Sequence, residues 1–408
     1  MKIWHPYTQE AIEPPPISIE RGEGAYLFTR DGRRLIDGIS SWWVNVHGHA
    51  HPLIAEAIAA QSRKLEQVIF AGFTHEPAEE LTERLGKIVP AGLERAFYSD
   101  NGSTAVEVAL KTAVQYWYNL NRPKKRRIVA LEHAYHGDTI GAMTVSADSP
   151  FTATFDALRL PVLRVRNSIE LERLLRARKD EIAVMIVEPL VQGAAGMLMY
   201  PPAELQQFSA LCRAHEVLLI ADEVFTGMGR TGRMFGCEHA NVIPDLMCIS
   251  KGLTGGFLPF AVTLSRTEIY GAFYSTDRSR TFFHGHSYAG NPLGCAAALA
   301  TLKIFESEPV FDRIAVIEGI HRERLVEFRH NPKVIDVRML GTIAAIELRA
   351  DDAGYLSSLR SRLYERFIDA GILLRPLGNV VYTVPPYVIR PDDLHYIYDV
   401  IGQVLNAL

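Results

Sequence analysis

The sequence predicts an α/β protein whose main layer is a mostly parallel sheet. Between about residues 95 and 265, short apolar runs alternate with segments of helical periodicity, a pattern typical of βαβ units. The runs are almost entirely apolar, as expected for strands that helices cover on both faces. The predicted strands are 95–98, 128–131, 182–187, 217–221, 246–249 and 260–264.

The ends of the chain are organised differently from its middle. Residues 25–28 and 34–37 flank Asp31-Gly32, which is a hairpin signal, and helical periodicity begins at Pro52. A small-residue helix follows Asn291-Pro292, and short strands and helices follow it. We expect residues 1–50 to belong to the small domain and the pocket, residues 51–296 to form the large domain, and residues 297–408 to form an α+β small domain.

Composition narrows the class of partner. The 408 residues are 48% hydrophobic and carry a net charge of −4, which gives no reason to expect nucleic acid or an anionic membrane. The basic run 124–127 follows a proline, and we expect a solvated loop there. The chain has no apolar run of membrane-spanning length, and its first residues lack an apolar signal core.

The cysteines indicate the compartment. Four cysteines without CxxC spacing indicate buried free thiols rather than a disulfide framework or a zinc site. We therefore expect a reducing, cytoplasmic location.

Two of the predicted strands deliver ionisable residues to their carboxyl ends. Asp222 ends the run 217–221, and Lys251 closely follows the run 246–249. Open α/β sheets bind ligands at this edge. A desolvated lysine can attack a carbonyl, and a carboxylate can hold a proton on a pyridine nitrogen, so the pair suits a pyridoxal phosphate enzyme. Taken singly, the aspartate could be a helix cap and the lysine a solvated loop residue.

A phosphate site is predicted beside this pair. Gly102-Ser103-Thr104 opens a helix after a strand, so free backbone N–H groups and hydroxyls meet at a positive helix end. The alternative is plain helix capping. Tyr135 follows the run 128–131 and could stack on a planar cofactor, or pack in the core.

Other motifs remain open or are rejected. Residues 227–232 match GxGxxG, but they neither follow their strand directly nor precede a helical pattern, so we reject a dinucleotide site and keep Arg230 as an anion contact. His47, His49 and His51 alternate without acidic or thiol neighbours at ligand spacing, so we expect no metal there. Arg375 follows an apolar run and suits either a carboxylate clamp or a surface ion pair.

These residues, in this order, resemble the class III aminotransferases, which are fold-type I pyridoxal phosphate enzymes. The resemblance covers essentially the whole chain. It rests on the motifs 4–9 (WHPYTQ), 37–43 (DGISSWW), 133–138 (HAYHGD), 222–224 (DEV), 229–232 (GRTG) and 385–387 (PPY).

The resemblance implies roles for individual residues. Lys251 would carry the cofactor and move the proton, Asp222 would pair with the ring nitrogen, and Tyr135 would lie against the ring. The phosphate would be held by Gly102 and Ser103, with His286 and Ser287 from a neighbouring subunit of a homodimer. Tyr7 would join Lys251 and Asp222 as a catalytic group. The substrate pocket would comprise Tyr7, Trp42, Trp43, Tyr135, Arg230, Lys251, Gly285 and Arg375.

Within the class, the WHPYTQ start and the paired tryptophans resemble the members of biotin biosynthesis. These transfer an amino group to 8-amino-7-oxononanoate, with S-adenosylmethionine as the expected donor and lysine as the open alternative. Ala194 stands where glutamate-using relatives have a second glutamate, which argues against glutamate as donor. His286 replaces a proline usual in the family, and its role stays open. The rivals are another diamine or ω-amino acid aminotransferase, and a non-catalytic pyridoxal phosphate carrier.

Overall fold

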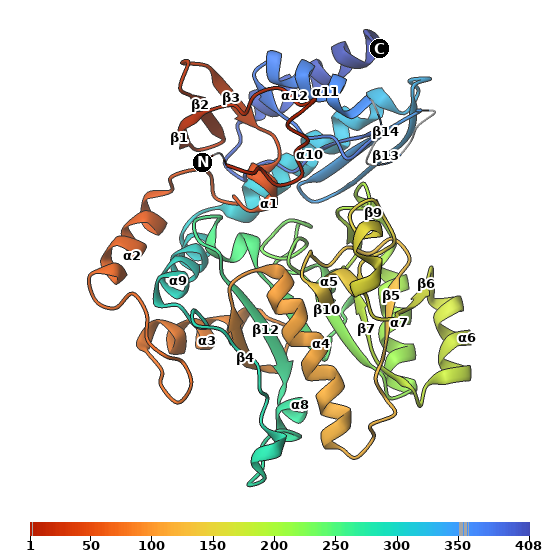
Figure 1. The fold of residues 1–408 in the computed structure, drawn as a ribbon. Coiled ribbons are helices and arrows are strands. Elements are labelled where there is room, and N and C mark those ends of the chain that lie inside the picture. Colours follow the sequence, from red (N-terminus) through yellow and green to blue (C-terminus); the bar gives the residue numbers. More distant parts are fainter. Residues whose placement is uncertain (2, 351–353, 355–356, 358) are drawn as a thin grey trace.

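The computed structural model describes residues 1, 3–350, 354, 357 and 359–408. Within these residues the centre of the fold is a seven-stranded sheet (Figure 1). Strand β12 runs antiparallel to both neighbours and the other neighbouring pairs run parallel, so every strand except β12 points its carboxyl end to one edge. The order is β4 (Leu93–Ser99), β12 (Ala261–Arg266), β11 (Leu246–Ile249), β10 (Leu218–Asp222), β7 (Ile182–Val187), β5 (Arg127–Leu131) and β6 (Leu163–Val165).

The central strands are apolar because both of their faces are covered. In β7 every residue is buried. Val184 and Ile186 pack in the core that includes the inner face of helix α4, whereas Met185 and Val187 pack in the core that includes helices α3 and α7. This alternation between two cores explains the near-continuous apolar runs of the sequence.

Helices flank the sheet on both faces (Figure 1). None of the helices in the described part of the chain is both long and apolar enough to cross a membrane. The helices of this region are α2 (Pro52–Ser62), α3 (Glu76–Ile88), α4 (Gly102–Asn119), α5 (Ile140–Val145), α6 (Ser168–Arg178), α7 (Pro202–Ala214), α8 (Thr267–Gly271) and α9 (Pro292–Ser307). Short elements join them: η1 (Ala153–Leu158), η2 (Gly236–Ala240), η3 (Lys251–Thr254), η4 (Arg278–Arg280), β8 (Val191–Gln192) and β9 (Leu198–Met199).

The two ends of the chain meet in the upper part of Figure 1, where the red N-terminal strands lie beside the blue C-terminal elements. Strand β15 pairs in parallel with β3, which joins the C-terminal region to the N-terminal hairpin. A separate antiparallel sheet, in the order β13, β14, β16, packs against α10. The elements are β1 (Ile19–Glu23), β2 (Tyr26–Thr29), β3 (Arg34–Asp37), α1 (Ser40–Trp43), α10 (Val310–Phe328), β13 (Val334–Leu340), β14 (Ile343–Leu348), α11 (Leu359–Asp369), β15 (Ile372–Leu373), β16 (Val380–Thr383) and α12 (Pro391–Asn406).

This pairing supports a division into two domains, which we propose as residues 51–296 for the large domain and residues 1–50 with 297–408 for the small one. Helix α9 runs across residue 296, so the boundary passes through a helix that packs on α2 and α3. The N-terminal segment joins the small domain because β3 pairs with β15.

The predicted α/β class is confirmed, and each of the six predicted strands coincides with an observed one. The predicted hairpin at Asp31-Gly32 is β2 paired with β3. The short edge strand β6 was not predicted. The loop 227–232 leads into the short turn η2 rather than a helix. All four cysteines are free and buried.

The expectation of a solvated loop at residues 124–127 was wrong for Lys125, which is 2% exposed. Its Nζ donates to the carbonyl oxygens of Lys179, Ile182 and Glu216 at 3.1, 3.0 and 2.6 Å, and it lies 4.3 Å from the centre of the Trp117 ring. Burial lowers the pKa of this amine to about 8. The carbonyl oxygens and the aromatic face replace the water that the ammonium loses.

The turn between β13 and β14 attaches the small domain to the glycine-rich loop of the large one. Thr342 donates its backbone N–H to the Arg230 carbonyl at 2.9 Å. Gly341, at φ +57°, comes so close that a Cβ atom there would stand 2.3 Å from the carbonyl carbon of Thr231 and 2.4 Å from the Gly232 nitrogen. Only glycine fits this contact between two backbones.

We predict that Gly341→Ala destabilises the protein more than Gly24→Ala does. Gly24 has the same φ of +57° but open space around its Cβ position, so alanine there costs about 1–2 kcal/mol for the left-handed backbone alone. At Gly341 the collision with backbone adds about 1–3 kcal/mol. Urea unfolding of both variants measures the difference. Equal midpoints would contradict the tight contact.

Candidate active site

Lys251 and Asp222 meet at the carboxyl ends of adjacent parallel strands. Asp222 is the last residue of β10 and pairs in register with Cys248 of β11, and Lys251 begins the turn η3 just after β11. Both line a cavity of about 590 Å³. Its wall includes six residues predicted for the site, namely Trp43, Gly102, Ser103, Tyr135, Asp222 and Lys251, and others such as Asp100, His136, Asp138, Glu188 and Phe225.

The Asp222 carboxylate is held by two hydrogen bonds. One oxygen accepts from the backbone N–H of Val224 at 3.1 Å, and the other lies 2.7 Å from Nδ1 of His136. Both side chains are buried, at 5% and 4% exposed. His136 therefore fixes the direction of the carboxylate, which the sequence did not reveal because the two residues are 86 positions apart.

The surroundings of Lys251 favour its neutral amine. Burial lowers the pKa of this amine, and the charge of Arg230 adds to the effect, while Asp222 and Glu188 oppose it. The Nζ atom lies 5.4 Å from the centre of the Trp43 ring. Because a neutral amine is a nucleophile and a base, this pocket prepares Lys251 for both tasks.

Glu188 is a second buried carboxyl group in the cavity, and we assigned it no role from the sequence. Its oxygens accept from the backbone N–H groups of Tyr135 and Gly193, both at 3.0 Å. Burial raises the pKa of Glu188 to about 7, and the Asp222 charge adds to the effect. Glu188 thus ties together two loops that form the cavity wall.

The start of α4 forms a cradle of closely packed loops. Asn101 caps the helix by accepting from the Thr104 N–H at 3.0 Å, while the first N–H groups of a helix have no partners within it. A Cβ atom at Gly137 would stand 2.0 Å from Oγ of Ser103, and one at Gly102 would stand 2.6 Å from Val224. Only glycine at these two positions lets the loops pack this closely around the helix start, where an anion would approach.

A polar group and aromatic rings extend the site away from Lys251. Tyr7 and Tyr135 both donate to the carboxylate of Asp138, the latter at 2.9 Å, and burial raises the pKa of the Tyr135 hydroxyl. Tyr7 meets Trp42 edge-on at 5.3 Å between ring centres, and the Arg375 guanidinium lies 5.3 Å from the Trp42 ring. Arg375 does not line the cavity that contains Lys251; it lines a second cavity of about 380 Å³.

The backbone that carries the tryptophans is strained. Ser40, Ser41, Trp42 and Trp43 all have positive φ, with Trp42 at +116°. The fully buried Asp37 holds this segment, because its carboxylate accepts from the N–H groups of Ile39 and Ser41 and from the Ser41 hydroxyl. Strain of this kind persists only where the surroundings over-determine it, and it is frequent at functional sites.

Arg230 is not brought to the cavity. It is 1% exposed, and its guanidinium donates to the carbonyl oxygens of Pro385 and Trp43 at 2.8 and 3.2 Å. The structure therefore corrects its expected role as a direct anion or substrate contact. Arg230 instead connects the strained tryptophan segment to the PPY motif, because its two terminal nitrogens donate to the Trp43 and Pro385 carbonyl oxygens.

The loop 285–287 lies at the edge of the molecule. Gly285 and Ser287 are exposed, and Nε2 of His286 is 4.0 Å from the carboxylate of Asp100, a residue of the cavity wall. The Ser287 carbonyl accepts from Gln67 at 2.7 Å.

The other histidines have local partners. His49 lies 2.9 Å from Asp37, His51 lies 3.2 Å from Glu308, and His47 packs on Phe305. Among the residues that the structure describes, no three His, Cys, Asp or Glu side chains are placed to hold a metal ion.

Comparison with known proteins places this site in a family. The model of the family described as aminotransferase class-III matches residues 7–405. The chain belongs to the class III aminotransferase family. Its members are pyridoxal-phosphate-dependent enzymes, which agrees with the lysine and carboxylate found at adjacent strand ends.

Relatives within the family share the full length. The adenosylmethionine-8-amino-7-oxononanoate aminotransferase of Synechococcus elongatus is 48% identical, over 100% of this chain and 99% of its own. The solved enzyme of that name from Methanocaldococcus jannaschii has a TM-score of 0.95 at 36% identity, covering 99% of this chain and 97% of that one. An amine transaminase from an uncultivated Pseudomonas species, solved in its PLP-bound form, has a TM-score of 0.92 at 30% identity, covering 100% and 99%.

We predict that Glu188→Gln changes how stability depends on pH. The folded pKa of about 7 lies above the ordinary 4.5, so the buried carboxyl group favours folding most below pH 4.5 and loses that contribution as pH rises to 7. The loss amounts to about 3 kcal/mol.

Denaturant unfolding of the cofactor-free protein should show this fall in the free energy of unfolding in the wild type and not in Glu188→Gln. Glu56→Gln, on the exposed face of α2, controls for loss of a surface carboxylate. A difference between wild type and Glu188→Gln that does not vary with pH would contradict the prediction.

Proposed function

We propose that this protein transfers an amino group to 8-amino-7-oxononanoate, giving 7,8-diaminononanoate in biotin biosynthesis, with S-adenosylmethionine as donor. The observation that carries the chemistry is the desolvated amine of Lys251 beside Asp222 at adjacent strand ends. The substrate follows from relatives of that name that match over the whole chain. The free cysteines suit a cytoplasmic location.

The residues of the cavity fit pyridoxal phosphate. The cavity of about 590 Å³ is lined by a buried carboxylate, an amine with lowered pKa, and a helix N-terminus that begins at Gly102. In our proposal Asp222 pairs with the ring nitrogen, Tyr135 lies against the ring, Gly102 and Ser103 hold the phosphate, and Lys251 carries the cofactor.

When bound, the cofactor supplies a ring that accepts electrons from the carbon next to the reacting nitrogen. Asp222, directed by His136, holds the proton on the ring nitrogen. The Lys251 amine takes the proton from the donor's carbon and later returns a proton to complete the transfer. Burial lowers the pKa of this amine, which favours the neutral form that acts as a base. Donor and acceptor use the pocket in turn, so one set of walls serves both half-reactions in a ping-pong scheme.

The aromatic rings give the oxo acid a path. Tyr7 and Trp42 meet edge-on and lead from Tyr135 to Arg375. An unbranched acid with its carboxylate on Arg375 would lay its methylene chain along these rings and bring its oxo carbon toward Lys251. Tyr7 and Asp138, hydrogen-bonded at the pocket mouth, are polar contacts for the donor. Trp43 closes the pocket beside Lys251.

Product analysis tests this proposal. The protein should form 7,8-diaminononanoate from 8-amino-7-oxononanoate, and parallel reactions with S-adenosylmethionine or lysine identify the donor. Turnover of pyruvate or 2-oxoglutarate with simple amines, without the diamine from either donor, would instead assign the amine transaminase activity named for the Pseudomonas neighbour.

Arg375→Ala should weaken mainly the half-reaction with the oxo acid. Loss of a charge-assisted pair costs about 1.5–3 kcal/mol, so KM for the oxo acid should rise at least 10-fold. The donor half-reaction, followed by the cofactor's absorbance, should change less. Arg362→Ala, an exposed arginine on α11, is the matched control. Equal damage to both half-reactions would mean one shared carboxylate site.

We also propose a homodimer whose sites are completed across the interface. Four large hydrophobic residues, Ile69, Phe73, Phe283 and Tyr288, are 61–76% exposed and form an apolar patch. Its two segments adjoin, because Asn291 donates to the Glu66 carbonyl and Gln67 to the Ser287 carbonyl. A partner chain would cover this patch, and the loop with His286 and Ser287 would then complete the partner's phosphate site.

Complementation should reveal the shared sites. A Lys251→Ala chain and a His286→Ala/Ser287→Ala chain should each be inactive alone. In a heterodimer, the chain with intact Lys251 receives an intact loop from its partner, so activity should return. If heterodimers form but stay inactive, the loop acts within its own subunit and the shared-site model is wrong.

A further inference from the structure

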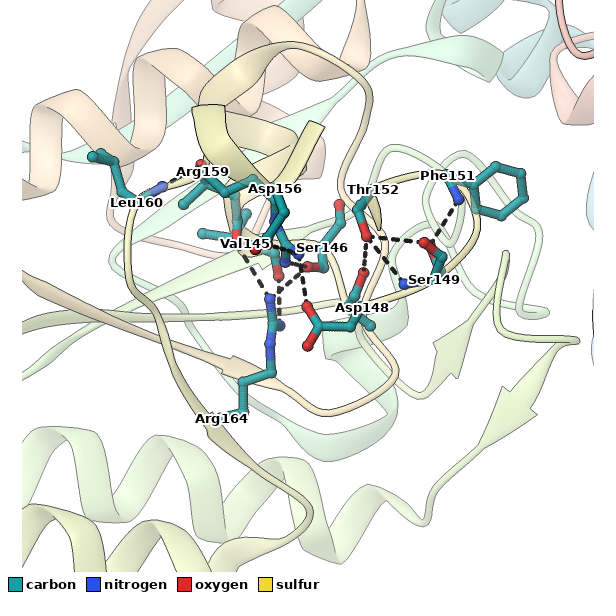
Figure 2. Close-up of polar contacts among 12 residues, drawn as sticks. Val145, Ser146, Asp148, Ser149, Phe151, Thr152, Asp156, Arg159, Leu160 and Arg164 are labelled. Atoms are coloured by element: carbon teal, nitrogen blue, oxygen red, sulfur yellow. Dashed lines mark hydrogen bonds and ion pairs between the residues drawn. The ribbon is translucent and has the colours of Figure 1, made fainter. Parts of the chain in front are cut away.

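Within the segment between α5 and β6, residues 146–160 form a strap beside the site. Figure 2 shows how two arginines fasten its base: Arg159 and Arg164 both donate to the Ser146 carbonyl, and Arg159 also pairs with Asp148 at 2.7 Å. Arg164 reaches further, to the carbonyl of Val145 at 3.1 Å. These charge-assisted bonds hold both ends of the strap together.

The tip of the strap is fixed as well. The hydroxyl of Thr152, 1% exposed, accepts from the Ser149 N–H at 3.0 Å and donates to the Ala147 carbonyl at 3.1 Å (Figure 2). The Phe151 N–H donates to the Ser149 hydroxyl at 3.3 Å. The tip is therefore a closed turn that gives Phe151 a defined direction.

The strap is also tied to the turn that carries Tyr135. The Ser146 hydroxyl accepts from the His136 N–H at 2.9 Å, and the Ala147 N–H donates to the Ala134 carbonyl at 2.7 Å. Hydrogen bonds thus join the strap to the cavity wall, and they fix the position of Phe151 relative to Tyr135.

Phe151 packs against two aromatic residues of the proposed substrate pocket. Its ring lies 5.7 Å from the ring of Tyr7 at 80° and 6.2 Å from the ring of Tyr135 at 62°. Tyr7 in turn contacts Trp42. The N-terminal segment that carries Tyr7 has no helix or strand before residue 19 among the residues that the structure describes, so contacts such as that with Phe151 help to position Tyr7.

We infer that Phe151 is a specificity-determining residue, which sets the width of the pocket and selects unbranched aliphatic chains over branched or aromatic ones. The inference rests on the proposed aminotransferase function, since it concerns the substrates of that site. The physical basis is steric: a ring held by a fastened strap cannot move aside for a bulky substituent, whereas a methylene chain passes along its edge.

The test uses the holoenzyme and a series of oxo compounds from unbranched to branched and aryl-substituted, with wild type, Phe151→Ala and Phe151→Leu. The ratio of kcat/KM for unbranched over bulky substrates should fall at least 10-fold in Phe151→Ala, and Phe151→Leu should restore part of it. Phe155→Ala, on the same strap and 49% exposed, is the control and should leave the ratio unchanged. Titration of the cofactor into each apo variant, followed by absorbance, should give the wild-type dissociation constant.

A ratio within 2-fold of wild type in Phe151→Ala, or an equal loss for all substrates, would overturn the inference. Failure of the proposed function looks different, since wild type would then not form the diamine at all. In that case the ratio is still read from single-turnover absorbance changes of the bound cofactor with the amine counterparts of the same series.

Arg159→Met is a second test of the inference. This variant loosens the strap without changing the Phe151 ring, so the ratio for unbranched over bulky substrates should fall as in Phe151→Ala.

Discussion

The structure depends on one constraint: Lys251 must be kept from water in a pocket that also contains carboxyl groups, because burial is the main cause of the lowered pKa of its amine. Asp222 and Glu188 raise this pKa, whereas burial and the charge of Arg230 lower it. Protein must therefore cover the carboxyl edge of the sheet. Trp43, packed on Phe225 with ring centres 4.5 Å apart, is part of that cover, and its ring centre lies 5.4 Å from the Lys251 amine.

The small domain explains how Trp43 is held. Hydrogen bonds hold the strained segment 40–43 at two points. The Asp37 carboxylate accepts from the Ser41 N–H, and the Ser40 hydroxyl donates to the Val384 carbonyl of the C-terminal region at 2.8 Å. Arg230 adds its bond to the Trp43 carbonyl. Residues far apart in sequence thus converge on one short stretch of backbone, and the parallel pairing of β3 with β15 brings them together.

The part of the site that lies at strand ends could be predicted from the sequence. Apolar runs locate the strands, parallel strands share an edge, and so Asp222, Lys251, Gly102 and Tyr135 were placed together correctly. Residues whose position depends on loops could not be predicted in the same way. The sequence assigned no role to Glu188, because that role comes from two backbone N–H groups that no periodicity reveals.

The wrong expectations have a related physical cause. Arg230 and Lys125 are cations in polar sequence surroundings, which favours solvent or an anion as partner. In the structure, both side chains instead donate to backbone carbonyls of distant segments. Such contacts arise only when the chain has folded, so local sequence carries no sign of them.

The central claim is that Lys251 is the residue that carries the cofactor. Borohydride reduction of the holoenzyme, followed by proteolysis and peptide mass spectrometry, tests it most directly. We predict one modified peptide, with a phosphopyridoxyl group on Lys251 and none on a Lys251→Ala chain. Attachment to a different lysine of the wild type, or bound cofactor that leaves Lys251 unmodified, would contradict the account.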